Sequence, residues 1–512
     1  MSESASTGVL YPLDSKPPVP KALILATQHV LTMFGATVAV PLLFKEPLEF
    51  QGPELAILIS SVMICSGFAT AVQLLFGSRL PIIQGVSFSF LAAFFACVAF
   101  AKANPDPEIS HGALSMSYIA GSIIVGSVVE IIVGYSGLVG KLRRAITPVV
   151  IGPVIMLIGL ALFNFGWPSA AAHWPTGGLT ILLVIVFSLF LSKKSAIVRT
   201  LPILLAVLIV WALCIVLTQA GVYGEGHNAA VSFAGLGEVP WFRSNLAWGE
   251  NPVLLPWGLP RFEVALIVAT LAGFLASMLE SIGDYHGAAA MAETHEPTDE
   301  QISKGIGAEG VGCLGTGLLG GFSSTSYSEN IALIGLTRVA SRYVVLMAAG
   351  LLVFLGLFAK FGGVVATIPG PIVGGLYCTL FGLISAVGIQ QTAKADLFSQ
   401  RNLFIIGFSL FMGLSVPAWF ADTMIPIADY SADLLTHFPQ GAYVDFTQSN
   451  VVIPGAGKGV VSGLLPTGPA NVLISLGSTG MGVAAIIGLT LDNIVPGTDT
   501  ERGIVPQEVP TA

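Results

Sequence analysis

Long apolar runs occupy most of this chain, and they constrain its fold more than any other feature. Of the 512 residues, 54% are hydrophobic and 10% are charged, whereas a soluble domain carries about 25% charged residues. A run of about 20 apolar residues can cross a bilayer as one helix. The sequence therefore predicts an all-α polytopic membrane protein with 14 transmembrane segments, near residues 21–44, 54–76, 80–102, 114–135, 146–165, 177–194, 200–221, 262–283, 305–321, 324–340, 343–361, 366–388, 402–420 and 465–490.

The basic residues set the orientation, because cytoplasmic loops of membrane proteins are enriched in Lys and Arg. With the N-terminus inside, all but six of the 21 Lys and Arg residues fall on the inner side. The six on the outer side are Lys45, Lys102, Arg243, Arg261, Lys360 and Lys458. This asymmetry predicts a multi-pass protein of the plasma (inner) membrane with both termini in the cytoplasm.

Fourteen segments divide into a 7+7 inverted repeat, since the second copy of an odd-numbered unit crosses the membrane in the opposite direction. The third segment, RLPIIQGVSFSFLAAF, is interrupted at Pro81 and Gly85, and its partner, the tenth, reads GGFSSTSYSENIALIGL. Both predict a short extended stretch followed by a helix. Paired interruptions at corresponding places in two repeats are typical of a transporter's binding site, although Gly and Pro are also common in ordinary transmembrane helices.

Two acidic residues lie within the eighth apolar segment, where ionisable groups are costly and usually line a cavity or an ion path. Glu280 and Asp284 are four residues apart, so a helix places them on one face. Two carboxylates together disfavour double ionisation, which makes one of them a candidate proton carrier. Alternatively, the helix ends near Gly283 and Asp284 already lies among the lipid headgroups.

Glu329 and Asn330 follow the irregular stretch of the tenth segment, where a half-helix is expected to begin. Free backbone N–H groups and the positive end of the helix dipole stabilise a carboxylate or a substrate carbonyl there. A simple helix cap is the alternative explanation for Glu329. Asn330 offers both a donor and an acceptor and is a candidate substrate contact. Since ionised carboxylates only accept hydrogen bonds, two of them suit a neutral ring with N–H donors and C=O acceptors better than an anion. Tyr327 and Phe88 are candidates to sandwich such a ring.

Three further polar residues lie in apolar segments. His29 orders the site by hydrogen bonding or is a packing histidine, and Glu309 pairs with a neighbouring segment or titrates. For Glu130 a structural hydrogen bond is the expected role. The five cysteines indicate neither disulfides nor a metal site, and no P-loop, nucleotide fingerprint or catalytic triad is present. An enzyme, a bound cofactor and a nucleic-acid partner are therefore not expected.

Together these residues resemble the nucleobase–ascorbate transporter family, also called nucleobase:cation symporter-2. Its motif is [QEP]-N-x-G-x-x-x-x-T-[RKG], and this chain has ENIALIGLTR at 329–338, with Ala332 where the family has Gly. The resemblance continues in QHVLTMFGATVAVP at 28–41, LESIGDYHGAA at 279–289, IPGPIVGGLYC at 368–378 and LDNIVPG at 491–497. It extends over nearly the whole chain.

The resemblance implies a homodimer in which a core domain (segments 1–4 and 8–11) moves like an elevator against a gate domain (segments 5–7 and 12–14). The implied divisions are a cytoplasmic tail (1–20), two core parts (21–135 and 262–361), two gate parts (136–261, with an outer loop, and 362–495) and a second tail (496–512). Residues 421–464 form a long outer loop without an assigned structure. By motif match, Glu280 and Glu329 bind the base, Phe88 and Tyr327 flank it, Ala36 lies near, and His29, Asp284 and Glu309 have polar or ionisable roles.

The substrate implied by the resemblance is a nucleobase, with uracil as first choice. Glu at the first motif position is typical of uracil-type and broad carriers, whereas ESIGDY at 280–285 is similar to purine and ascorbate members. Xanthine, urate or a broad nucleobase range therefore stays open. Proton symport fits the titratable carboxylates, although Na⁺ can use the same oxygens. An anion transporter or channel on the same fold is the competing class.

Overall fold

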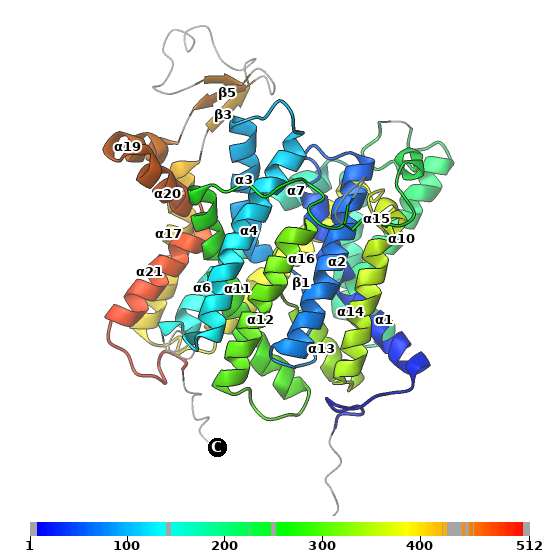
Figure 1. Cartoon of the computed structure of the whole chain (residues 1–512), viewed down its shortest axis with the longest axis horizontal. Coiled ribbons are helices and arrows are strands. Elements are labelled where there is room, and N and C mark those ends of the chain that lie inside the picture. The colour runs from blue at the N-terminus through cyan, green and yellow to red at the C-terminus, as the bar shows by residue number, and fades with distance from the viewer. Residues whose placement is uncertain are drawn as a thin grey trace, which may run out of the picture.

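The computed structural model describes residues 8–139, 145–224, 226–246, 252–421, 423–426, 443–445, 450–453 and 455–504 (Figure 1). Long helices run through the molecule, and the first and last described residues lie at the same end. The first half contains α1 (Val19–Leu43), α2 (Gly52–Phe76), β1 (Gln84–Val86), η1 (Phe88–Phe90), α3 (Leu91–Ala103), α4 (His111–Tyr135), α6 (Pro148–Ala161), α7 (Phe163–Ala171), α8 (Trp174–Ile185), the π-helix η2 (Val186–Leu191), α9 (Ala196–Thr200), α10 (Pro202–Gln219) and η3 (Ala234–Gly237).

The second half repeats the alternation of long helices with a broken segment. It contains α11 (Val264–Met291), α12 (Asp299–Leu319), β2 (Ser324–Ser326), α13 (Ser328–Thr337), α14 (Arg342–Leu357), α15 (Ala359–Val365), α16 (Gly370–Thr392), α17 (Gln400–Phe420), β3 (Thr423–Pro426), β4 (Tyr443–Asp445), β5 (Asn450–Ile453), α19 (Ala456–Leu464), α20 (Thr467–Gly477) and α21 (Gly480–Ile494).

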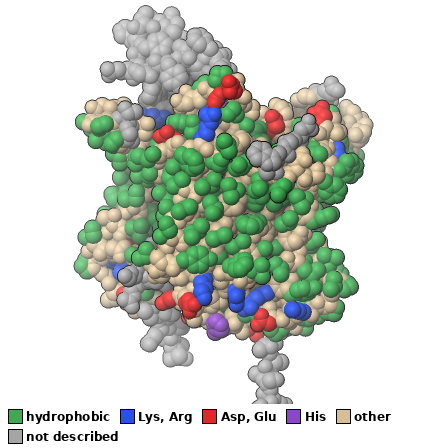
Figure 2. Space-filling view, viewed as in Figure 1, with side chains coloured by type: hydrophobic (Ala, Val, Ile, Leu, Met, Phe, Trp, Pro, Cys, Tyr) green, Lys and Arg blue, Asp and Glu red, His purple; other side chains and the backbone are tan. Residues whose placement is uncertain are grey.

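Not all of the 14 predicted segments are long apolar helices in the part of the chain that the structure describes. Within the described residues, nine helices are long and apolar enough to cross a membrane, or ten if the bent pair α14 and α15 counts as one. The other predicted segments are short or interrupted, except for the ninth, which lies in the unbroken but less apolar helix α12. The third and tenth begin as strands, the fourteenth breaks into α20 and α21, and α14 and α15 meet at an angle of 81°. Figure 2 shows the wide apolar belt expected of a polytopic membrane protein, with charged side chains at its two ends.

The helices pack in two sets, each drawn from both halves of the sequence. In the first set α12 lies against α2 and α4, α14 packs along α2, and α11 and α13 join them with α1 and α3. In the second set α16 packs along α6, α7 and α8, while α17 and α21 pack on each other and on α6. Contacts between the sets are fewer and involve mainly α1 and α11.

Residues 421–464, predicted as an outer loop of an otherwise all-α protein, contain strands in the part that the structure describes. β3, β5 and β4 form an antiparallel sheet in that order, followed by α19. The sheet lies at the end of the molecule opposite the termini (Figure 1).

The two ends of the bundle are tied by ion pairs. At the end where the described chain finishes, the buried Asp492 of α21 pairs with Arg401 at 2.9 Å and with Arg502 at 2.8 Å, and the Thr147 hydroxyl donates to it. At the opposite end, Arg261 pairs with Asp106 at 2.6 Å.

Candidate functional site

The two interrupted segments meet in the middle of the molecule. β1 pairs antiparallel with β2, with Gln84 opposite Ser326 and Val86 opposite Ser324, and all six residues are buried. Each strand leads directly into a helix, β1 through η1 into α3 and β2 into α13. Extended backbone at membrane depth is tolerated only where other protein groups bond it, and this pairing supplies those bonds. The predicted extended stretches in the third and tenth segments are thus confirmed.

The Tyr327 side chain packs against the pair formed by β1 and β2. A Cβ atom on Gly85 would lie 2.4 Å from Cζ of the Tyr327 ring, so the ring packs directly on the Gly85 backbone. The Tyr327 hydroxyl donates to the Val86 carbonyl at 3.0 Å and accepts from Thr37 of α1 at 3.3 Å. Phe88, in η1, turns the other way and meets the ring of Phe381 on α16 edge-on at 6.0 Å. The two aromatic residues predicted to flank a substrate therefore follow the two paired strands: Phe88 begins η1 after β1, and Tyr327 precedes α13 after β2.

Glu280 and Asp284 both lie inside α11, which continues to Met291. The alternative in which the helix ends near Gly283 is therefore wrong. Asp284 accepts hydrogen bonds from the hydroxyls of Ser326 at 2.8 Å and Ser328 at 2.7 Å, so it faces the β2–α13 junction. Glu280 is half-buried one turn away and lies within electrostatic range of Asp284 and Glu329.

Glu329 lies in the first turn of α13, as the sequence predicted, and Tyr327 occupies the cap position without a side-chain cap bond. Glu329 lines a cavity of about 210 Å³ together with Ala36 of α1 and Ala332. The opposite wall comes from the second set of helices and includes Leu380 of α16 and Arg199 of α9. The cavity thus lies between the two sets of helices, and α13 presents its first turn to it.

Asn330 and His29 lie away from this cavity wall. The Asn330 amide donates to the His29 carbonyl at 2.9 Å and lies 3.2 Å from the ring nitrogen Nδ1, and both residues are buried. The pair joins α13 to α1 directly beside Glu329. Asn330, predicted as a substrate contact, therefore positions α13 in this structure.

Glu309 and Glu130 lie deeper, between α12 and α4. The Glu309 carboxylate accepts hydrogen bonds from Ser277 at 2.7 Å and from Tyr285 at 3.2 Å, and Gln73 donates to the Tyr285 oxygen at 2.7 Å. Glu130 is 1% exposed, and neither of its carboxyl oxygens has a hydrogen-bond partner among the described residues. The structural hydrogen bond expected for Glu130 is therefore wrong.

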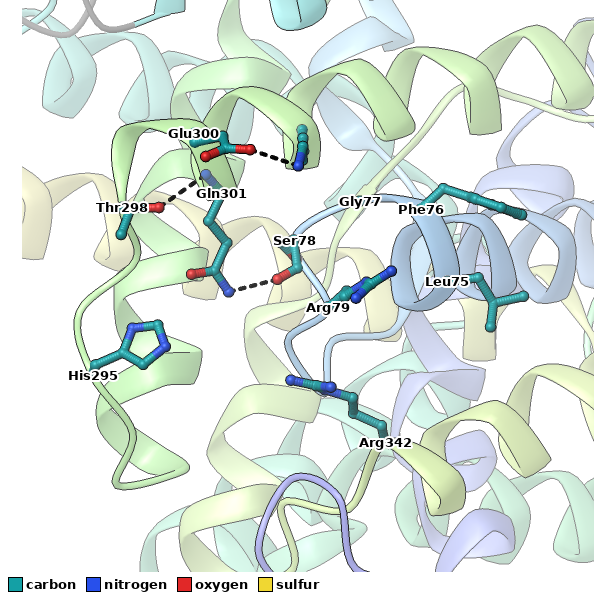
Figure 3. Close-up of a pocket in the computed structure, with 11 residues that line it drawn as sticks. Leu75, Phe76, Gly77, Ser78, Arg79, His295, Thr298, Glu300, Gln301 and Arg342 are labelled. Atoms are coloured by element: carbon teal, nitrogen blue, oxygen red, sulfur yellow. Dashed lines mark hydrogen bonds and ion pairs between the residues drawn. The ribbon is translucent and has the colours of Figure 1, made fainter.

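A second, larger cavity of about 420 Å³ opens between the α2–β1 turn and the start of α12 (Figure 3). Gln301 donates to the Ser78 carbonyl at 2.6 Å across it, and Thr298 caps α12 through the Gln301 N–H. Arg79 and Arg342 face it from the other side. None of the predicted site residues lines this cavity, so its size does not make it the functional site.

Serine hydroxyls around the carboxylates were missed by the sequence reasoning. Ser277, Ser281, Ser326 and Ser328 all bond within the network of Asp284 and Glu309. For Ser326 and Ser328 the signal is the run SSTSYSE at 323–329, whose hydroxyls must bond somewhere once the run is buried, and for Ser277 and Ser281 it is their place beside Glu280 in an apolar segment.

Comparison with known proteins identifies the family. A family model described as "Permease family" matches residues 20–422. The chain is 35% identical to rat solute carrier family 23 member 1, over 97% of this chain and 82% of that protein. It is 34% identical to nucleobase-ascorbate transporter 2 of Arabidopsis thaliana, over 81% of this chain and 80% of that protein. The chain belongs to the nucleobase–ascorbate transporter family. As a member of this transporter family it is a multi-pass membrane protein and not an enzyme.

Solved structures of other transporters share the fold of this family member. The transmembrane domain of a cyanobacterium bicarbonate transporter, BicA, is 15% identical, with a TM-score of 0.51 over 78% of this chain and 97% of that one. The murine solute carrier 26 family member A9 anion transporter, in the inward-facing state, is 12% identical, with a TM-score of 0.54 over 78% of this chain and 65% of that one. At these identities the similarity concerns the fold alone.

Proposed function

We propose that this protein imports a nucleobase, with uracil as first choice, by proton symport across the plasma membrane. The observation that supports it is the position of Glu329 in the first turn of α13, at a cavity between the two sets of helices. The α13 N-terminus offers backbone N–H groups to a substrate carbonyl, and Glu329 and Glu280 accept hydrogen bonds from ring N–H groups. Uracil presents both kinds of group side by side.

The two sets of helices support an elevator movement. In this proposal α1–α4 and α11–α14 form the core (21–135 and 262–361), and α6–α10 and α16–α21 form the gate (136–261 and 362–495). The interrupted segments and the carboxylates belong to the core, and α10 and α16 of the gate form the opposite wall of the cavity. The smaller contact between the sets suits a sliding motion. We further propose 14 crossing segments, a homodimer and cytoplasmic termini.

Xanthine, urate or a broader range of nucleobases is the alternative within the same class, because Glu329 accepts from any ring N–H. A second candidate is an organic anion, which Arg199 on the cavity wall favours. The relatives named for both nucleobases and ascorbate are compatible with either. Coupling to protons fits Asp284, Glu309 and His29, and coupling to Na⁺ is the competing case.

Uptake of labelled uracil and xanthine into proteoliposomes tests the proposal, with pH and Na⁺ gradients imposed separately and ascorbate as competitor. We expect uracil accumulation driven by the pH gradient alone. If no nucleobase accumulates, and excess cold nucleobase does not raise the thermal stability of the protein, the nucleobase proposal is wrong. Uptake of labelled ascorbate in the absence of nucleobase uptake would favour the anion transporter.

The variant Glu329→Gln tests the role of the cavity carboxylate. A hydrogen bond to a charged group contributes about 1.5–3 kcal/mol, so the affinity for uracil should fall by about 10–100-fold, with xanthine affected less. Glu46→Gln is the matched control, since Glu46 lies in an outer loop with 89% of its side chain exposed. Unchanged affinity and selectivity in Glu329→Gln would remove Glu329 from the substrate contact.

A further inference from the structure

Glu130 is a buried acid without a partner. It lies in the α4 helix, its side chain is 1% exposed, and neither carboxyl oxygen accepts or donates a hydrogen bond among the described residues. An ionised carboxylate in such a place is strongly unfavourable, and a buried charge persists only when it is paired. Among the described residues, no Lys or Arg side chain acts on Glu130, so none of them supplies a counter-charge.

The neighbouring helix α12 carries a second acid, Glu309, at the point along α4 where Glu130 lies. A Cβ atom on Gly310 of α12 would lie 2.8 Å from the backbone nitrogen of Ile131, so α12 and α4 touch at that point. Glu309 and Glu130 are the residues directly before these two in the chain, and Glu309 is the ionisable group that acts on Glu130. The other titratable groups on the helices packed against α4 are Asp299, Glu300, Lys304 and Cys313 on α12, Glu280, Asp284, Tyr285 and His286 on α11, and Cys97 and Lys102 on α3.

Glu309 and Glu130 differ in the hydrogen bonds that their carboxyl oxygens accept. Both oxygens of Glu309 accept bonds, one from Ser277 and one from Tyr285, which favours its ionised form. Gln73 donates to the Tyr285 oxygen, and this leaves the Tyr285 hydrogen directed at Glu309. Glu130 receives no donor of this kind, so the neutral acid is its stable form.

We propose that Glu130 and Glu309 together hold the transported proton, with Glu130 as its resting place. The inference rests on the proposed proton symport and assigns to Glu130 a function that the family motif does not contain. Neither acid lines the cavity that Glu329 lines. The proton and the substrate would thus occupy different places in the core and move with it as one body.

Hydroxyl groups connect this pair to the substrate site. Ser326 donates to Asp284, Ser326 and Ser281 lie 2.9 Å apart, and Ser281 also bonds to Glu309. A proton on Asp284 can pass to Ser326 as the Ser326 proton passes to Ser281 and the Ser281 proton to Glu309. Each hydroxyl gains one proton and loses one, so no charge remains along the route. The last step, from Glu309 to Glu130, requires the two carboxyl groups to move into hydrogen-bond contact, because neither oxygen of Glu130 has a partner among the described residues.

The variant Glu130→Gln in the full chain, reconstituted in proteoliposomes, tests this assignment. With one proton per base, a pH gradient of one unit supports at most about tenfold accumulation. We expect Glu130→Gln to retain counterflow of labelled uracil at equal pH but to lose this accumulation and the accompanying proton uptake. Glu130→Asp should restore part of the accumulation, because it restores the acid. Ser281→Ala should slow proton uptake while counterflow remains.

An infrared spectrum of the purified protein at neutral pH gives a readout that does not depend on transport. The parent should show a protonated carboxyl band that Glu130→Gln lacks and that the control Glu46→Gln retains. Persistence of that band in Glu130→Gln, or unchanged pH-driven accumulation, would overturn the assignment. Accumulation driven by Na⁺ instead of pH would also overturn it. Failure of the parent to transport any nucleobase would refute the proposed function, whereas the infrared result would still decide whether Glu130 holds a proton.

Discussion

The close contact between Gly85 and Tyr327 makes a quantitative prediction for Gly85→Ala. An added Cβ would lie 2.4 Å from Cζ and 2.7 Å from both Cε atoms of the ring, whereas carbon atoms in contact prefer about 3.5–4.0 Å. The ring must therefore retreat by about 1 Å or more. It cannot retreat freely, because its hydroxyl is bonded to the Val86 carbonyl at 3.0 Å.

Two contributions set the size of the effect. Overpacking a filled core costs about 1–3 kcal/mol, and leaving a buried polar group without its bond costs about 1–3 kcal/mol. These contributions overlap, since ring displacement relieves the first at the expense of the second. We therefore expect Gly85→Ala to lower the free energy of unfolding by about 2–4 kcal/mol. If the Tyr327 ring also flanks the substrate, affinity should fall in the same variant.

Thermal unfolding in detergent, with and without nucleobase, measures both effects. Gly350→Ala is the matched control, because a Cβ at Gly350 in α14 meets no atom within 4 Å. It should leave stability unchanged or raise it slightly, since Ala is the better helix former. In a Tyr327→Ala background the cost of Gly85→Ala should largely disappear, as expected for residues that interact directly. An equal cost in both backgrounds would refute the packing argument.

Two further predictions concern the ion pairs at the ends of the bundle. The Glu108 backbone N–H and Arg261 hold the pKa of Asp106 below its ordinary value of 3.8, so its stabilising effect is present above that pH and is lost as the pH falls through the folded-state pKa. Asp106→Asn should therefore lower the melting temperature at pH 7, and the difference from the parent should vanish in strong acid. Asp492→Ala leaves two partly buried guanidinium groups without their acid and should cost about 3–5 kcal/mol, a loss that high salt should change little because the pair is buried. A loss of stability at Asp492 that disappears in high salt would contradict the second prediction.

The interrupted segments of the candidate site could be predicted from the sequence because they break the pattern of a membrane helix. Gly85 and the SSTSYSE run interrupt apolar segments, and Glu280 and Glu329 place charge where apolar residues are expected. Each departure is costly in a membrane, so each predicts a compensating structure nearby. The pairing of β1 with β2 is that compensation.

The remaining details depend on the rotation of helices, which the sequence does not specify. Asn330 follows Glu329 in the motif, yet one step along α13 turns it about 100° away from Glu329, toward His29 and away from the cavity. Arg199 belongs to a loop helix far away in the sequence, and only the packing of the two sets of helices brings it to the cavity. Fewer long apolar helices than the 14 predicted segments are present among the described residues for a related reason. Hydropathy measures composition, whereas strands and bends at β1, β2 and α15 decide which segments remain continuous helices.

The carboxylates of the candidate site differ in their hydrogen bonds, and this difference separates them more clearly than their depth in the membrane does. Asp284 accepts hydrogen bonds from two side-chain hydroxyls and Glu309 from at least two, so their positions are fixed by the protein itself. No side chain among the described residues bonds to Glu329, although it lines the cavity. A carboxylate left without a side-chain donor at a cavity gains most when a ligand supplies one. A solute that brings N–H donors therefore completes the bonding of Glu329, whereas an anion would add a second negative charge to it.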